Sequence, residues 1–219
     1  MGVYDTQTLR KYCENHKGDI LDVGYLLTTS FRMVKPGSFR KYVSRLVEEG
    51  ILFPLDKGIY TIGEIPEKKI NDVLYEHYTA MGMGVGRGKT LLWKFGLDKK
   101  PEHIFVFSSV TNGNRNIGNF HITEYPGFLL TPLTSIVIMM ELNNVLRKGV
   151  DDQNMEVFML LKSYVDKYSD DYLPNINDPI YKLYPRIDFI SLANLLNRFH
   201  ISNRVMERYE EYSTIYDSK

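Results

Sequence analysis

Eight side chains near the N-terminus have the types and spacing needed to bind the phosphates and base edges of duplex DNA. Between Phe31 and Val47 the chain carries five basic residues and no acidic residue. The whole chain has 27 basic and 27 acidic residues, so this excess of positive charge is local. Cationic side chains bind phosphates, and arginine also reads base edges in the major groove. The candidate residues are Arg32, Lys35, Ser38, Arg40, Lys41, Ser44, Arg45 and Lys57.

A predicted helix presents half of these side chains to the bases. Phe39, Val43 and Leu46 recur at helical spacing and form one apolar stripe. A rotation of about 100° per residue places the polar residues on the opposite side, and a helix of this width fits the major groove. Ser38 is expected to cap the start of the helix, and Gly50 is expected to end it. The expected base contacts are Arg40, Lys41, Ser44 and Arg45, and the expected phosphate contacts are Arg32, Lys35, Ser38 and Lys57.

A tight hairpin is predicted to follow this helix. Residues 51–55 and 59–62 are apolar enough for strands, and the segment between them contains Gly58. Glycine readily adopts the positive φ that a short hairpin turn needs. Lys57 should therefore lie at the tip of the hairpin.

Two further helices are predicted before the cationic helix, at Thr6–Asn15 and at Ile20–Thr28, with Asp19 as the cap of the second. Residues 1–64 then form a winged helix-turn-helix, and this domain is predicted to bind DNA. Two alternatives stay open. The cationic face can be an ordinary solvated surface, or the winged helix can dock a protein partner.

Residues 65–219 are predicted to form a second domain with a small β-sheet and a helical C-terminal part, so the fold class is α+β. Strands are expected at His103–Val110 and Asn119–Thr123, with a turn at Asn112-Gly113 between them. The expected helices are Lys68–Tyr78, Thr90–Phe95, Leu133–Arg147, Met155–Tyr168, Asp188–Phe199 and Asn203–Tyr212. The last two also have the spacing of a second helix-turn-helix, although packing against the sheet or another subunit is the simpler interpretation.

A glycine-rich segment, Met81–Gly88, is followed by Lys89 and Thr90 and partly matches a phosphate-binding loop. The Walker A spacing requires glycine where this chain has Met83, and the loop should follow a buried strand. Instead, a helix is expected before it. The segment is therefore predicted to be a flexible glycine turn whose N–H groups, together with Arg87 and Lys89, can bind an anion such as a nucleic-acid phosphate. A nucleotide-binding enzyme that uses the Gly82–Gly88 loop is the less favoured alternative.

No pattern in the chain predicts catalysis, a cofactor or a metal. The five histidines show no metal-like spacing, and no serine lies in a Gly-x-Ser-x-Gly setting. The acidic pairs Asp151-Asp152 and Asp170-Asp171 are better explained as helix starts than as a two-metal site. Cys13 is the single cysteine, so no internal disulfide can form, and a buried structural role is expected.

The chain is also expected to have no membrane contact. Its most apolar run, Ser135–Met140, is too short to span a bilayer, and no secretion signal opens the chain. A cytoplasmic location follows by elimination.

Several short motifs occur in an order found in a known family. The cationic helix ends in Glu49-Gly50 before a strand, and the next strand begins Gly58-Ile59-Tyr60. The later motifs are Gly88, Phe95-Gly96-Leu97, His103–Phe107, Thr111-Asn112-Gly113 and Arg115. Over about residues 5–125 the chain thereby resembles the AbiEi family of antitoxin-type transcriptional regulators. It departs from that pattern at Lys100-Pro101 and after about residue 150.

The resemblance implies a DNA-binding autorepressor of a type IV toxin–antitoxin operon. Such proteins bind repeats in their own promoter and counter a nucleotidyltransferase-like toxin, with which no direct complex is expected. A homodimer would match palindromic repeats, but the sequence shows no dimer interface.

Overall fold

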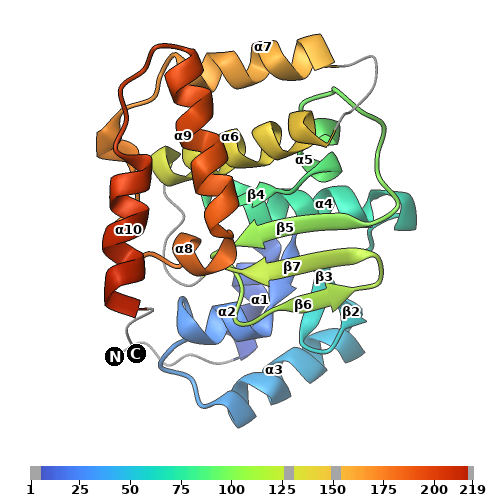
Figure 1. Ribbon diagram of the computed structural model, residues 1–219. Coiled ribbons are helices and arrows are strands. Elements are labelled where there is room, and N and C mark those ends of the chain that lie inside the picture. The colour runs from blue at the N-terminus through green and yellow to red at the C-terminus, as the bar shows by residue number, and fades with distance from the viewer. Residues whose placement is uncertain (1–5, 126–130, 149–153, 217–219) are drawn as a thin grey trace.

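The computed structural model describes residues 6–125, 131–148 and 154–216. The described chain is α+β and contains two small sheets, as the sequence predicts (Figure 1). The helices are α1 (Thr6–Asn15), α2 (Val23–Thr28), α3 (Pro36–Glu48), α4 (Glu67–Thr79), α5 (Lys89–Lys94), α6 (Thr131–Arg147), α7 (Asn154–Val165), α8 (Ile180–Leu183), α9 (Arg186–Arg198) and α10 (Val205–Tyr216). The strands are β1 (Ile20–Asp22), β2 (Leu52–Asp56), β3 (Ile59–Ile62), β4 (Gly84–Gly86), β5 (Ile104–Ser108), β6 (Arg115–Ile117) and β7 (Phe120–Glu124).

The N-terminal unit packs three helices against an antiparallel sheet of order β1-β3-β2. Leu9 of α1 and Phe39 and Leu46 of α3 are fully buried in its core. Pro36 is the first residue of α3 and Lys35 is its N-cap, so the expected cap by Ser38 is wrong. Proline suits this position because its missing N–H would have had no partner inside the helix. Ser38 instead lies in the first helical turn, where its N–H donates to the Lys35 carbonyl at 2.9 Å.

The predicted single helix at Ile20–Thr28 is also wrong at its start. Residues 20–22 form β1, and they pair with β3 from Ile20 opposite Thr61 to Asp22 opposite Ile59. Helix α2 begins only after Asp22, whose Oδ1 accepts the Tyr25 N–H at 3.0 Å. Asp22, not Asp19, is therefore the cap, and the strand is fixed by pairing with residues some 40 positions later.

The second sheet has the order β4-β5-β7-β6, in which β5 and β7 run parallel and the other pairs are antiparallel. Strand β4 lies within the glycine-rich segment, so the prediction of a flexible turn is wrong for residues 84–86. Gly84 is needed there, because a Cβ atom would lie 2.1 Å from the Tyr78 carbonyl oxygen and 2.7 Å from that of Phe107. The backbone of β4 therefore approaches both α4 and β5 too closely for any side chain.

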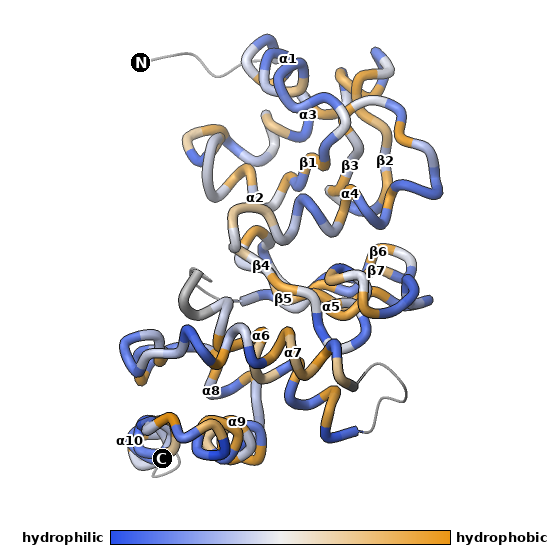
Figure 2. The backbone as a smooth tube through the Cα atoms, turned by 90° about the horizontal axis from the view of Figure 1, so that it is seen from above, coloured by the Kyte–Doolittle hydropathy of each residue, from blue (hydrophilic) through white to orange (hydrophobic). Residues whose placement is uncertain are grey.

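Helix α4 lies between the two sheets, as the tube view shows (Figure 2). Its buried residues Leu74 and Tyr78 belong to one apolar cluster with Ile20 and Ile59 of the small sheet and with residues of β5, β6 and β7. The two domains that were predicted to meet at residue 64 therefore share an apolar core.

The remaining helices cover the other side of the second sheet (Figures 1 and 2). Helix α6 carries five consecutive buried residues, Ile136–Met140, into the largest apolar cluster. Helices α9 and α10 lie side by side, and Ala193 and Val205 are buried between them and their neighbours. Helix α9 also packs against α6, so this helical pair contacts neighbouring helices rather than the sheet in the principal contacts of the described residues.

We expect Gly84→Ala to lower the free energy of unfolding by about 2 kcal/mol or more, because the new methyl group would collide with two backbone carbonyls. Urea denaturation followed by circular dichroism measures this. Gly37→Ala is the matched control, since a Cβ there meets nothing within 4 Å and lies in α3. It should be neutral or stabilising by up to about 1 kcal/mol. Equal stability of the two variants would contradict the close approach of β4.

Candidate nucleic-acid interface

The predicted DNA-binding side chains are accessible. Seven of the eight candidate residues are exposed, and only Ser38 is half-buried. Helix α3 buries Phe39, Val43 and Leu46 and leaves its cationic side to solvent. Lys57 occupies the turn between β2 and β3, where Gly58 has the expected positive φ of 78°.

Three of these residues line one groove. Arg40 and Ser44 of α3 and Lys57 of the hairpin turn border a hollow of about 620 Å³, and α2 closes its other side. Arg115 of β6 lines the same groove, although it is not one of the eight candidates. Among the described residues lining the groove, three are basic and none is acidic. The groove can therefore take an anionic ligand.

Arg115 joins the second sheet to the N-terminal unit. Its Nη1 donates to the Lys57 carbonyl at 3.4 Å, and its Nη2 lies 3.7 Å from Asp22 Oδ1. The side chain is 21% exposed, so it is anchored inside and reaches the groove at one edge. The resemblance motifs include Arg115, but its place beside α2 follows only from the contacts of its side chain with Asp22 and the Lys57 carbonyl.

The other candidates lie outside the groove. Arg45 turns toward α1, where it donates to Thr6 Oγ1 at 3.1 Å. Nearby, Glu49 at the end of α3 pairs with Arg10 at 2.6 Å, so part of the negative charge at this helix end is neutralised. Three further candidates, Arg32, Lys35 and Lys41, are exposed but do not line the groove.

The Asp22 carboxylate holds the groove in place. Its side chain is fully buried, and besides capping α2 it accepts a hydrogen bond from Tyr78 of α4 at 3.1 Å. Burial, and next the Asp22 charge, raise the pKa of Tyr78 well above its ordinary value, so the phenol stays a donor.

A second polar link joins Asp19 to His77 at 3.0 Å. Burial alone would raise the pKa of Asp19, but the hydrogen bond from His77 lowers it below its ordinary value.

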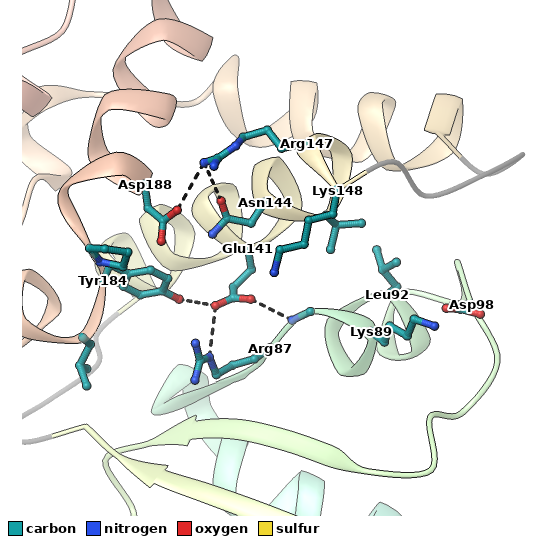
Figure 3. A pocket seen from close by; sticks show the side chains of 14 residues that line it. Arg87, Lys89, Leu92, Asp98, Glu141, Asn144, Arg147, Lys148, Tyr184 and Asp188 are labelled. Atoms are coloured by element: carbon teal, nitrogen blue, oxygen red, sulfur yellow. Dashed lines mark hydrogen bonds and ion pairs between the residues drawn. The ribbon is translucent and has the colours of Figure 1, made fainter.

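The glycine segment that was expected to bind an anion is bound by a carboxylate of the protein, that of Glu141. Figure 3 shows Glu141 of α6 directed at the loop. Its Oε2 accepts the Gly88 N–H at 2.9 Å, and its Oε1 lies 3.3 Å from Arg87 Nε and accepts the Tyr184 hydroxyl at 2.6 Å. Burial, and next the Glu141 charge, raise the pKa of Tyr184 far above its ordinary value. Lys89 is exposed beside this cluster.

Thr90 also differs from the hydroxyl residue of a Walker loop. It is buried, and its Oγ1 accepts the Phe105 N–H at 3.0 Å. Both the loop N–H and this hydroxyl therefore have structural partners.

Within the described ranges, no group of three or more His, Cys, Asp or Glu side chains is placed to hold a metal ion. Asp170 and Asp171 begin a short 3-10 turn capped by Ser169, while Asp151-Asp152 lies outside the described residues. Cys13 is buried as expected, and this burial raises the pKa of its thiol to about 11.

Comparison with protein-family models and with curated protein sequences finds no match for this chain. The resemblance to the AbiEi family therefore stays a prediction. None of the helices in the described part of the chain has both the length and the apolar character needed to cross a bilayer.

We expect Asp22→Ala to lower the free energy of unfolding by about 2–4 kcal/mol. The variant loses the helix cap, which contributes about 1 kcal/mol, and leaves Tyr78 and Arg115 without their buried partner. Asp22→Asn keeps a cap acceptor and should recover part of the loss. Urea denaturation measures both, and an Asp22→Ala midpoint equal to that of the unmodified protein would contradict the role of this carboxylate.

Proposed function

We propose that this protein is a DNA-binding transcriptional regulator whose residues 1–64 form a winged helix-turn-helix. The order α1-β1-α2-α3-β2-β3 with a β1-β3-β2 sheet is typical of that module. In this arrangement α3 is the recognition helix, and the β2–β3 hairpin is the wing. The observation that carries the proposal is the groove between them, which brings Arg40, Lys57 and Arg115 together without an acidic neighbour among its described lining residues.

The proposed contacts follow from this geometry. Arg40 and Ser44 lie on the flank of α3 that faces the groove and are assigned to base edges, together with Lys41 on the exposed side. Lys57 is assigned to a phosphate, because a flexible ammonium group at a hairpin tip fixes position without reading sequence. Arg115 adds a phosphate contact from outside the winged module.

Following the resemblance, we further propose that the protein is an antitoxin of the AbiEi type. It would act in the cytoplasm, repress its own toxin–antitoxin operon through promoter repeats, and oppose a nucleotidyltransferase-like toxin without forming a stable complex. On this proposal it is not an enzyme, and it binds palindromic repeats as a homodimer. The test is a gel-shift titration of the full chain with DNA from upstream of its own gene, beside an unrelated duplex of equal length.

Arg40→Ala should weaken binding to the specific site by about 1–3 kcal/mol and bring it closer to non-specific affinity, because a base contact is lost. Fluorescence anisotropy with the specific and the unrelated duplex measures this difference. Lys167→Ala is the matched control, since Lys167 is exposed and follows α7, and α7 lies far from α3 (Figure 1). Unchanged discrimination in Arg40→Ala would contradict the assignment of the recognition surface.

Lys57→Ala should weaken binding to both duplexes alike, because a phosphate contact carries no sequence information. The slope of log affinity against log salt concentration should flatten by about one unit. A salt titration of each duplex measures the slope. If the loss were confined to the specific duplex, the wing would have to contact bases instead.

A further inference from the structure

Two adjoining cavities surround the Arg87–Lys89 loop, on the opposite side of the second sheet from α4. One, of about 690 Å³, lies between the loop, the end of α6 and the start of α9. The other, of about 490 Å³, lies between the same loop and β5. Arg87, Lys89, Glu141 and Lys148 line both, so the two cavities adjoin at these residues. Their volumes fall in the range that binds small organic molecules, roughly 300–1,000 Å³.

The inner wall of this site consists of charged side chains that are already paired with one another. Glu141 is buried and bound by Arg87, Tyr184 and the Gly88 N–H. Arg147 lies 3.4 Å from Asp188 on the α9 side. These groups neutralise each other and shape the cavity.

Two ammonium groups remain for a ligand. Lys89 and Lys148 are exposed, and neither makes an ion pair or a side-chain hydrogen bond with any residue in the described ranges. Figure 3 shows Lys148 extending from the end of α6 toward the loop. Two lysines flanking a cavity from opposite elements suit a phosphate chain, which binds ammonium groups as point charges.

An aromatic surface lies at the other end of the same site. Phe105 and His103 of the β5 region line the second cavity, and the Phe105 side chain is 45% exposed. The Phe105 ring stacks on His121 of β7 at 4.6 Å between centroids, and His121 stacks on His103 at 5.3 Å. On the other side of the His121 ring, Nδ1 lies at hydrogen-bonding distance, 2.8 Å, from Asn116 Oδ1 of β6. Exposed, ordered rings on the open face of a sheet are a stacking platform for nucleobases.

We infer that this cavity binds a nucleotide, with the base stacked against Phe105 and His103 and the phosphates between Lys89 and Lys148. The Glu102 carboxylate, which lines the same cavity as Phe105 and His103, disfavours phosphate at that end and can accept hydrogen bonds from amino groups of a base. A free nucleoside triphosphate and the end of a nucleic-acid strand both present this chemistry. The cavities share no described lining residue with the groove at α3, and α5 and α6 beside them lie apart from α3 (Figure 1).

Isothermal titration calorimetry of the full chain tests the inference with four separate probes: ATP, UTP, a short single-stranded RNA and inorganic tripolyphosphate. At least one of the base-containing probes should bind. For every probe that binds, Lys89→Ala and Lys148→Ala should each weaken the affinity at least tenfold. The affinity of each variant should also depend less steeply on salt concentration. Phe105→Ala should weaken the base-containing probes by about tenfold and leave tripolyphosphate unchanged. Binding of the RNA without the triphosphates identifies a strand end as the ligand, and the reverse identifies the free nucleotide.

Two controls keep this result separate from the proposed DNA binding. Lys11→Ala, at an exposed position on α1, should bind every probe as the unmodified protein does. Arg40→Ala should retain nucleotide binding, and Phe105→Ala should retain the shift of promoter duplex. The inference is overturned if none of the base-containing probes binds at millimolar concentration, or if binding survives all three cavity substitutions.

Discussion

The buried carboxylate of Asp22 is the contact on which the arrangement of both units depends. It ends β1, begins α2, accepts the Tyr78 hydroxyl from α4 and lies beside Arg115 from the second sheet. A buried charge is tolerated only when hydrogen bonds and an opposite charge compensate for its lost hydration. Here that compensation comes from three different elements, so α2 cannot move relative to α4 or β6 without exposing an uncompensated charge. The groove beside α3 takes its shape from this constraint.

Glu141 has a comparable role on the other side of the second sheet. Its carboxylate binds the Gly88 N–H and Arg87, and these contacts link α6 to the glycine loop. The side chain of Arg87 is further held over the Phe107 ring at 4.2 Å. Internal neutralisation therefore removes Arg87 from ligand binding and leaves that role to Lys89 and Lys148, which project from the ends of two packed elements.

Local patterns in the sequence predict the helices and the longer strands well. Thr6–Asn15 and Ile59–Ile62 match α1 and β3 at both ends, because clear apolar periodicity and a glycine turn define them. The three-residue strands β1, β4 and β6 were not predicted, since each is too short for a periodic signal. Strands β1 and β4 are fixed by pairing with strands further along the chain, and β6 is fixed by pairing with the adjacent β7. The cationic face of α3 was predicted from spacing alone. Arg115 could not be assigned to the groove, because only the fold brings it there, and the same holds for the partnership of Glu141 with Gly88.

The position of α4 has a consequence for how the molecule loses its structure. One side of this helix covers Ile20 and Ile59, and the other side covers β5 and β7, so a single apolar cluster serves both sheets. Denaturation of either half would expose the apolar residues of this cluster in the other half. A cut in the short connection between β3 and α4 would divide the chain, but the two pieces would stay bound to each other. The two halves should therefore melt in one cooperative transition.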